Sequence, residues 1–394
     1  MILVISLDGI CHTDLDLDKM PNLTRLAKEG VYTKRLRTVF PSVTWNIHTS
    51  VTTGKGPDRH GIIGNTAFSR KKNTQFHYYD PNQVDASAIQ EPNVFGLAAA
   101  KGKTSAAICW PLTQKDMHIR YNIPEFYQKE YFYKYSTQDL VKELLAEGLP
   151  FERYGDWSSI HELAALQDDL TCRIVEYIIA QKQPDVLFTH FLIHDSFQHH
   201  FGIKNHESQW TMEYLDSLVG RLVAALRSVN LYDTSHMIVF SDHGHEAVSK
   251  YFDLASVLKS LDIRGCDIHC VNNGGALFFY IDQNRISKNL MDQLSEGFKL
   301  HEAVESVYTK EEANLLGLNS QLNPDSFPDL ILTLKHGWCL DNDRKTRSMH
   351  GYNPETNPRM DGFMIRAGKS FEAGIVEDTE RICEIFHIVE NLLS

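Results

Sequence analysis

Short, nearly continuous apolar runs recur along the chain and separate segments with helical periodicity. The runs span residues 2–7, 105–109, 186–192, 237–241, 276–281, 330–334 and 363–366. Strands that are apolar on both faces are typical of sheets covered by helices on both sides. The helical segments between the runs include residues 21–29, 93–101, 161–181 and 207–227. This alternation predicts an α/β fold, a three-layer αβα sandwich with a mainly parallel central sheet.

The domain organisation follows from length and from the regularity of this alternation. A chain of 394 residues would suit two or three average domains, yet no internal repeat or low-complexity linker divides it. We therefore expect a single domain over residues 1–394. Residues from about 265 to 337 break the alternation and carry few polar candidates for chemistry. This stretch is predicted to be a smaller inserted cap that covers the sheet edge.

The charge balance argues against a nucleic-acid partner. The chain has 39 Lys and Arg residues against 51 Asp and Glu residues, a net charge of −12 at pH 7, and no basic stripe. An anionic substrate would have to be attracted locally, and bound metal ions are one means of doing so.

The N-terminus and the cysteines bear on location. Residues 2–7 end at Asp8 with no basic residue before them, so they are predicted to form a strand and not a signal peptide. No apolar stretch approaches the roughly 20 residues of a membrane helix. The seven cysteines are scattered without a CxxC pair, and Cys266 and Cys270 are interpreted as small buried side chains. These features predict a cytoplasmic protein with reduced thiols and no membrane partner.

Acidic residues follow three of the predicted strands. Asp8 comes after residues 2–7, Asp195 after residues 186–192, and Asp242 with His243 after residues 237–241. Ligands of open α/β sheets bind beyond the carboxyl ends of the strands. We therefore expect these side chains to meet at one rim of the sheet.

The spacing of carboxylates and imidazoles is typical of metal ligands. Adjacent residues such as Asp242 and His243 face opposite ways in extended chain, and a four-residue helical spacing places Asp195 and His199 on one face. His350 lies in a Met-His-Gly-Tyr turn. An oxygen and nitrogen donor set suits Zn²⁺ and is tolerated by Mn²⁺. The candidate ligands are Asp8, Asp195, His199, Asp242, His243 and His350.

Several short motifs occur in a familiar order. They are Asp8-Gly9, Phe40-Pro-Ser-Val-Thr44, Thr53-Gly54, His60-Gly-Ile-Ile-Gly-Asn65, Asp195-xxx-His199, Ser241-Asp-His-Gly244 and His350-Gly-Tyr352. From Asp8 to about Phe363 the chain resembles the nucleotide pyrophosphatase/phosphodiesterases of the alkaline phosphatase superfamily. Trp110-Pro111 is similar to an element on the substrate side of that family.

The resemblance implies an alkaline phosphatase-like catalytic domain with two zinc ions. One ion would be held by Asp195, His199 and His350, the other by Asp8, Asp242, His243 and Thr44. Thr44 would attack phosphorus, and Asn65 with the Thr44 N–H group would donate to a phosphoryl oxygen. The substrate would be a small phosphate ester or nucleotide-like molecule. Gln198 departs from the pattern, since the family usually has Gly there, and its side chain is expected to tighten the pocket.

The chemistry is consistent with these residue types. Coordination to a cation makes the alkoxide of a hydroxyl accessible near neutral pH, and hydrolysis of the phospho-threonine by water completes the reaction. Thr44 also has the sequence context of a helix N-cap, a role compatible with catalysis. Trp45 beside it could stack a base or an aryl leaving group, or could form a wall of the core.

Other activities share the same metal motifs. A phosphomonoesterase and a C–P hydrolase resembling phosphonoacetate hydrolase remain open, because the leaving-group pocket decides between them. The absence of an Arg next to the motifs favours singly charged diesters. A scaffold without activity is disfavoured by the intact Thr44, and a phosphoglycerate-mutase-like isomerase by its usual Ser nucleophile. His245 and Glu246 either support a ligand or lie on the rim, and residues 14–18 are interpreted as a solvated acidic turn.

Overall fold

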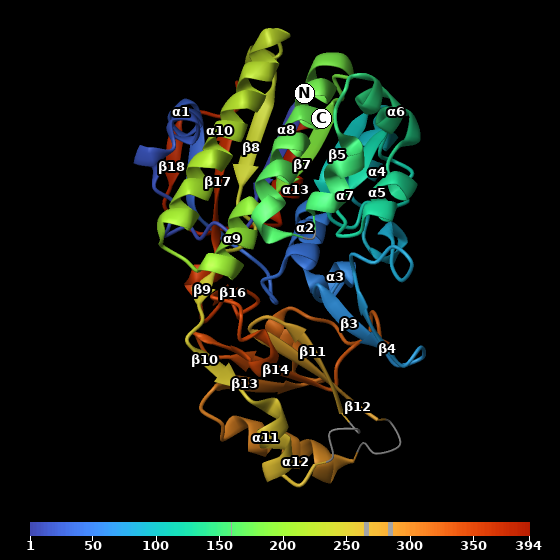
Figure 1. Ribbon diagram of the computed structural model, residues 1–394, viewed down its shortest axis with the longest axis vertical. Helices are drawn as coiled ribbons and strands as arrows, with labels where there is room; N and C mark the ends of the chain where they lie inside the picture. Colours follow the sequence, from blue (N-terminus) through green and yellow to red (C-terminus); the bar gives the residue numbers. More distant parts are fainter. Residues whose placement is uncertain (159, 264–267, 283–286) are drawn as a thin grey trace.

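The computed structural model describes residues 1–158, 160–263, 268–282 and 287–394. The chain forms a large lobe around a long sheet and a small lobe around a second sheet (Figure 1). The large-lobe strands run in the order β18-β2-β17-β8-β1-β7-β5-β6. Their bounds are β1 Ile2–Leu7, β2 Val31–Arg37, β5 Ser105–Trp110, β6 Tyr121–Pro124, β7 Val186–Phe191, β8 His236–Phe240, β17 Gly362–Ala367 and β18 Gly374–Val376.

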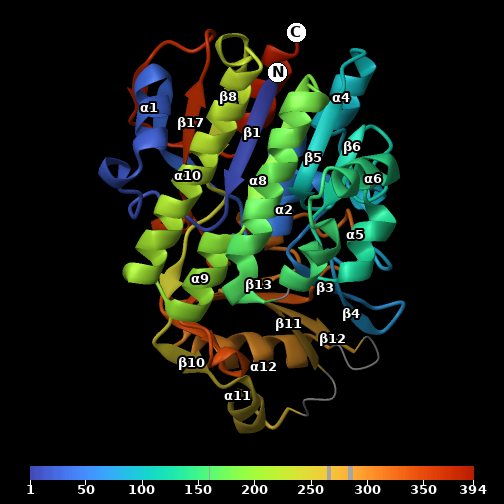
Figure 2. The ribbon, with the colours of Figure 1, turned by 45° about the horizontal axis from the view of Figure 1, so that its top comes forward.

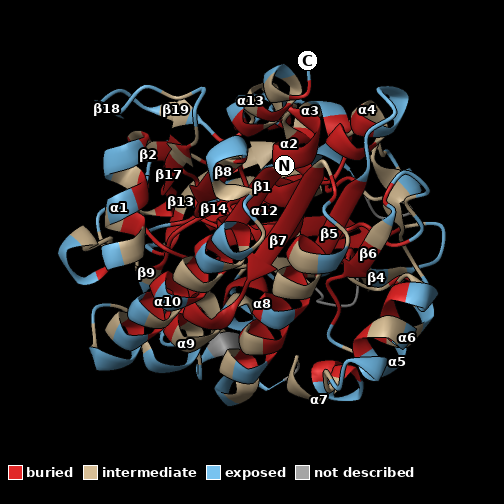
Figure 3. Cartoon of the chain, turned by 90° about the horizontal axis from the view of Figure 1, so that it is seen from above, coloured by how far each residue is buried: buried red, intermediate tan, exposed pale blue. Residues whose placement is uncertain are grey.

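The centre of the large sheet is parallel, as the apolar runs predict. Strands β8, β1, β7, β5 and β6 pair in parallel, whereas β17 is antiparallel to both β8 and β2. Helices cover both faces (Figures 2 and 3). One face carries α1 Pro21–Glu29, α8 Ala164–Gln181 and α10 His206–Ser228; the other carries α2 Thr44–Thr53, α4 Val94–Ala100 and α13 Glu384–Leu392. The predicted α/β sandwich with a mainly parallel sheet is confirmed.

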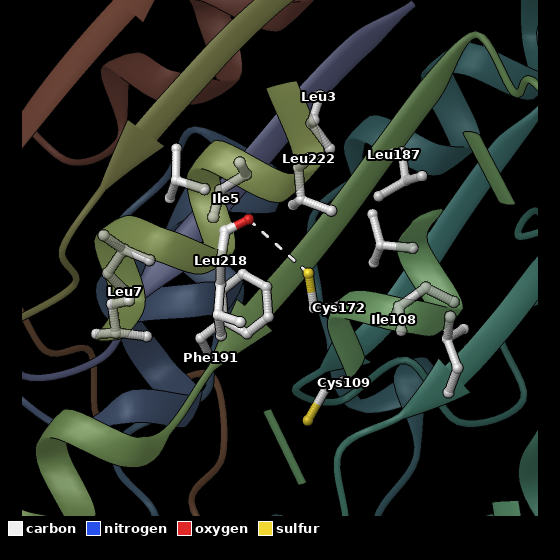
Figure 4. Close-up of a cluster of buried hydrophobic side chains, with 14 of the residues drawn as sticks. Leu3, Ile5, Leu7, Ile108, Cys109, Cys172, Leu187, Phe191, Leu218 and Leu222 are labelled. Carbon is white, nitrogen blue, oxygen red and sulfur yellow. Dashed lines mark hydrogen bonds between the residues drawn. The ribbon is translucent and has the colours of Figure 1, made fainter. Parts of the chain in front are cut away.

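Alternation along β1 explains why both faces are apolar. Leu3, Ile5 and Leu7 pack against α8 and α10, and Figure 4 shows them beside Leu218 and Leu222 of α10. The intervening Ile2 and Val4 pack with α2, α4 and α13 on the other face. Burial of such side chains contributes about 1.5–3 kcal/mol each, so this strand anchors the sheet from its centre.

Several predicted boundaries shift by a residue or more. The strand predicted over 186–192 ends at Phe191, because Leu192 has helical dihedral angles and begins helix α9, Ile193–Phe201. The helix predicted over 161–181 starts with a 3-10 turn, and α8 begins at Ala164. Strand β2 was missed, since its partly exposed residues do not form a continuous apolar run.

The small lobe has its own antiparallel sheet and core. Its strands pair in the order β11-β12-β14-β13, with bounds β11 Ile268–Asn273, β12 Ala276–Ile281, β13 Val304–Thr309 and β14 Leu330–Leu334. Helices α11 Leu254–Ser260 and α12 Lys288–Lys299 pack on it. The lobe lies beyond the carboxyl ends of the large-sheet strands (Figure 1), so the expectation that it covers a sheet edge is wrong. The apolar strands of this lobe pair with one another and pack with α11 and α12 in a core of their own, so they do not add to the edge of the large sheet.

Smaller elements complete the two lobes, and β19 among them pairs with β2 in the large sheet. They are α3 Pro57–His60, β3 Thr66–Ser69, β4 Thr74–His77, α5 Lys129–Tyr135, α6 Gln138–Ala146, α7 Tyr154–Trp157, β9 Glu246–Ala247, β10 Lys250–Phe252, β15 Trp338–Leu340, β16 Ser348–Met349 and β19 Glu380–Arg381. Among the described residues, no helix is both long and apolar enough to span a membrane. The cysteines in the described ranges are free thiols, and Cys266 lies outside those ranges.

Candidate metal and phosphoryl-transfer site

Three predicted ligands meet at the ends of the paired strands β1 and β8, and we call them the inner group: Asp8, Asp242 and His243. The His243 Nε2 atom lies 3.4 Å from Asp8 Oδ1 and 3.5 Å from Asp242 Oδ2. All three side chains are almost fully buried. The atoms Asp8 Oδ1, Asp242 Oδ2 and His243 Nε2 have no hydrogen-bond partner among the described residues. Buried polar atoms are normally paired, so this cluster fits a bound cation.

The protonation of the inner group follows from burial. Burial raises the pKa of Asp8 well above its ordinary value, and the charges of Asp242 and Asp195 raise it further. Burial lowers the pKa of His243 to about 3. The imidazole is therefore neutral at physiological pH and offers a lone pair, while the carboxylates gain from a nearby positive charge.

The remaining predicted ligands form what we call the outer group: Asp195, His199 and His350. Asp195 and His199 lie one turn apart on α9, and Asp195 Oδ1 is 3.4 Å from His199 Nε2 and 3.7 Å from His350 Nε2. The Nδ1 atom of His350 lies 2.8 Å from the Ser42 carbonyl oxygen, which orients its Nε2 atom toward Asp195. The four-residue spacing thus has the geometry that the sequence predicts.

Asp168 holds the start of helix α9. Its carboxylate accepts from the N–H groups of Leu192 at 3.0 Å and Ile193 at 2.9 Å. A carboxylate at a helix N-terminus pairs with donors that have no intrahelical partner. Asp168 therefore sets the position of the helix that carries Asp195 and His199.

His245 lies within the site and not on its rim. The side chain is buried, with Nε2 2.6 Å from Asp195 Oδ1 and Nδ1 3.0 Å from Ser348 Oγ. Asp195, His243, His245 and His350 present ligand atoms within 4.8 Å of one another. His245 is thus a candidate ligand, or an orienting partner of Asp195, that the sequence analysis placed only among alternatives.

Thr44 is the first residue of α2, and its N-cap is Val43. The N-cap reading of Thr44 is therefore wrong by one position, because Val43 is the residue with extended dihedral angles. Thr44 lines a cavity of about 400 Å³ together with Asp8, Asp195 and His350. The position at a helix start also directs backbone N–H groups and the helix dipole toward an anion.

Asn65 lines the same cavity and is held by α2. Its Oδ1 atom accepts from the Trp45 N–H group at 2.9 Å. Because that bond fixes the orientation of the amide, the Nδ2 group is the part left to donate elsewhere. The predicted partners Thr44 and Asn65 are thus neighbours in space despite their separation in sequence.

The two tryptophans predicted near the substrate do not line the cavity. Trp45 is buried behind Tyr79 and Tyr127, with ring centroids 5.5 and 6.1 Å away. Trp110 is buried against His48, at 4.8 Å between centroids. The aromatic lining comes from Tyr79 and Tyr127, which the sequence analysis missed because they lie in loops without periodic signal. The described lining residues include no Lys or Arg.

Gln198 points away from this cavity. It is buried, and its Nε2 group donates to the Gly9 carbonyl oxygen at 2.7 Å. Gly9 has φ +80°, and a Cβ there would lie 3.0 Å from the Asp195 Cα atom. Gln198 therefore ties α9 to the loop after β1, and the expectation that it narrows the pocket is wrong.

A buried pair that sequence reasoning missed lies behind Asp8. His190 of β7 has Nδ1 2.8 Å from Glu125 Oε2 and Nε2 3.3 Å from Asp8 Oδ2. Burial alone would lower the pKa of His190, but Glu125 and Asp8 outweigh it and raise this pKa well above its ordinary value. A carboxylate behind a histidine orients the ring, so the pair positions Asp8.

Taken together, strand-end Asp and His clusters on an αβα sandwich define an α/β protein with candidate metal-binding groups beside the hydroxyl-bearing Thr44. A family model described as Type I phosphodiesterase / nucleotide pyrophosphatase matches residues 2–353. The chain therefore belongs to this family and is a hydrolase, as the motifs predict.

Individual relatives agree with this assignment. The bovine (Bos taurus) bis(5'-adenosyl)-triphosphatase ENPP4 is 24% identical over 402 residues, which cover 100% of this chain and 78% of the relative. Human (Homo sapiens) ectonucleotide pyrophosphatase/phosphodiesterase family member 1 is 29% identical over 262 residues, 65% of this chain and 25% of the relative. The solved structure of murine ENPP5 superposes with a TM-score of 0.76 at 19% identity, covering 100% of this chain and 94% of that one.

Proposed function

We propose that the chain hydrolyses phosphodiester or pyrophosphate-type bonds in small nucleotide-like molecules, through a phospho-threonine at Thr44 beside two divalent metal ions. The observation that carries this proposal is the inner group: its buried ligand atoms have no hydrogen-bond partner within the described part of the chain, and they lie next to a cavity that Thr44 and Asn65 both line. Zn²⁺ suits the mixed carboxylate and imidazole donors, and Mn²⁺ is tolerated.

The residues divide into two sets of ligands. Asp8, Asp242, His243 and Thr44 would hold one ion; Asp195, His199 and His350, with His245 beside them, would hold the other. When bound, such ions lower the pKa of a hydroxyl and offset charge on phosphoryl and leaving oxygens.

The protein's own groups carry the bond changes. The Thr44 Oγ1 atom loses its proton to solvent and bonds to phosphorus, while the leaving group departs with the P–O bond electrons and takes up a proton. Water then attacks the phospho-threonine, which releases phosphate monoester and restores the Thr44 hydroxyl. Asn65 Nδ2 and the Thr44 N–H group donate to a non-bridging oxygen, where charge is greatest in the transition state.

The cavity lining supports a singly charged, flat substrate. Without Lys or Arg among the described lining residues, a doubly charged phosphoryl end gains no ion pair. Tyr79 and Tyr127 offer aromatic surface for a base or an aryl group. A bis(5'-adenosyl)-triphosphatase among the relatives, and a structure of inactive murine ENPP5 in complex with AMP, support a nucleotide-like substrate.

A substrate panel with controlled metal content tests this function. Demetallated protein is reconstituted with Zn²⁺, Mn²⁺ or Mg²⁺ and assayed on an aryl phosphodiester, an aryl phosphomonoester, an aryl phosphonate monoester and phosphonoacetate. We expect chelation to abolish activity, Zn²⁺ or Mn²⁺ to restore it, and the diester to have the highest kcat/KM. Full activity without metal would rule out the mechanism, and preference for the monoester or phosphonoacetate would replace the proposed substrate class.

A further inference from the structure

The end of β11 and the turn to β12 in the small lobe contact the loop that carries Asn65, and Asn273, the last residue of β11, makes this contact. This side chain is 3% exposed. Its Oδ1 atom accepts from the Asn65 N–H group at 2.9 Å and the Thr66 N–H group at 3.1 Å, and its Nδ2 group donates to the Thr66 carbonyl oxygen at 3.0 Å. A single buried amide thus satisfies three main-chain groups of Asn65 and Thr66.

The Asn65 side chain lies between this amide and helix α2. Its backbone is held by Asn273, and its Oδ1 atom accepts from the Trp45 N–H group, one residue after Thr44. The approach is close: a Cβ on Gly64 would lie 2.7 Å from Asn273 Oδ1. The position of the Asn65 Nδ2 group relative to Thr44 is therefore set from two sides, one of them in the small lobe.

The same turn also contacts the loop of a predicted metal ligand. The Gly275 N–H group donates to the His350 carbonyl oxygen at 2.9 Å. Gly274 has φ +73°, and a Cβ there would lie 2.1 Å from that oxygen, so only glycine permits the contact. The small lobe thus contacts the cavity through main chain and a neutral amide.

We propose that Asn273 is a positioning residue, through which the small lobe fixes the Asn65 amide at the phosphoryl oxygen beside Thr44. This inference rests on the proposed function, in which Asn65 donates to that oxygen. Hydrogen bonds aimed at developing charge are sensitive to displacement, and a shift of about 1 Å can cost roughly 100-fold in rate. The role also explains why a stretch without catalytic side chains packs against the site.

Asn273→Ala and a matched control variant test the proposal. Asn323 of the small lobe donates through Nδ2 to the Gly61 carbonyl oxygen at 2.6 Å, so it anchors the same loop at a point away from Asn65. We expect Asn273→Ala to lower kcat roughly 10- to 100-fold with metal content and KM little changed. Asn323→Ala should lower the melting temperature but keep kcat within about 2–3-fold of the wild-type value. Equal loss of kcat in the two variants would overturn the proposal.

A double-mutant cycle separates positioning of Asn65 from general stability. If Asn273 acts through Asn65, Asn273→Ala should have almost no further effect on kcat in the Asn65→Ala protein. The preference between the Rp and Sp forms of a phosphorothioate diester should change alike in both single variants and stay unchanged in Asn323→Ala. The same loss of kcat in both backgrounds would mean that Asn273 acts on folding alone.

The remaining outcomes are also decisive. An Asn65→Ala protein with a wild-type rate would remove the donor role from the proposed function itself. A slow Asn65→Ala protein beside a fast Asn273→Ala protein would overturn only the inference. Should Asn273→Ala fail to fold, Asn273→Asp keeps both acceptor bonds and replaces the donor to Thr66 with a carboxylate oxygen that repels the Thr66 carbonyl group. We expect a loss of kcat in this variant that again disappears in the Asn65→Ala background, and persistence there would overturn the proposal.

Discussion

The inner and outer groups balance their charge in opposite ways. Asp8 of the inner group is surrounded by other carboxylates, and burial together with those charges raises its pKa well above the ordinary value. Burial would also raise the pKa of Asp195 in the outer group, but His199 and His245 outweigh burial and hold that pKa well below the ordinary value. The outer side chains are also more exposed, at 17% for Asp195 and 19% for His199 against 4% for Asp8.

Because of this difference in burial and charge, we expect the two groups to bind their ions with different strength. The carboxylates of the inner group are buried and its own imidazole, His243, is neutral at physiological pH, so a bound cation would stabilise them. The outer group places its carboxylate within hydrogen-bond distance of His245 and faces the cavity. We therefore expect the inner ion to be held more tightly and the outer ion to be more easily exchanged.

The largest expected effect separates the nucleophile from the ligands. Thr44→Ala should lower kcat on the order of 10⁵-fold or more, because the variant loses the attacking oxygen. Metal content should stay near two ions per chain, since the Asp and His residues supply most of the affinity. Kinetics and metal analysis on one preparation check this, with Thr44→Ser as the control that keeps a hydroxyl. Loss of the inner ion in Thr44→Ala would show that Thr44 belongs chiefly to the inner ligand set.

A paired ligand substitution tests the comparison directly. Asp242→Ala should weaken binding of the inner ion by more than about 100-fold, because the variant removes one of the two carboxylates of the inner group. His199→Ala should weaken the outer ion by about 10- to 100-fold, since His245 lies beside Asp195 and offers another imidazole. Competition with a chelator, followed by metal analysis, measures both affinities. A greater loss in His199→Ala would reverse the order of the two groups.

The smallest expected effect concerns stability and pH in the metal-free protein. The folded pKa of Asp8 lies above its ordinary value of 3.8, so the folded chain keeps the proton in the interval between the two values. Ionisation of Asp8 therefore costs folding free energy, and this cost grows as pH rises from 3.8 towards the folded pKa, above which it stays constant. Asp8→Asn should raise the melting temperature of the metal-free protein by a few degrees at pH 8, and less at pH 5.

A surface variant completes this measurement. Asp139 is highly exposed, so Asp139→Asn should leave the melting temperature nearly unchanged at both pH values. With metal present, the sign for Asp8→Asn should reverse, because the variant loses a ligand. A gain that is larger at pH 5 than at pH 8 would contradict the assigned direction of the Asp8 pKa.

Some residues of the site could be predicted from the sequence, and others could not. The strand-end positions of Asp8 and Asp242 followed from apolar runs, and the pairing of Asp195 with His199 followed from helical spacing. The sequence analysis missed His190 and Glu125. A histidine inside an apolar run and a glutamate after Pro124 belong to no sequence motif that would indicate a role in the site. Tyr79 and Tyr127 were missed for the same reason, and Trp110 was misplaced because its neighbours along the chain do not reveal which face it packs against.

By itself, the sequence determined the α/β class, the family and the residues with metal-ligand chemistry, because periodicity and motif order are properties of short segments. The tertiary structure decided which side chains share a cavity, the opposite pKa shifts of Asp8 and Asp195, and the contact of Asn273 with Asn65. Burial, charge and contact depend on residues far apart in the chain. Asn65 and Asn273 are separated by 208 positions, and only folding brings them within hydrogen-bond distance.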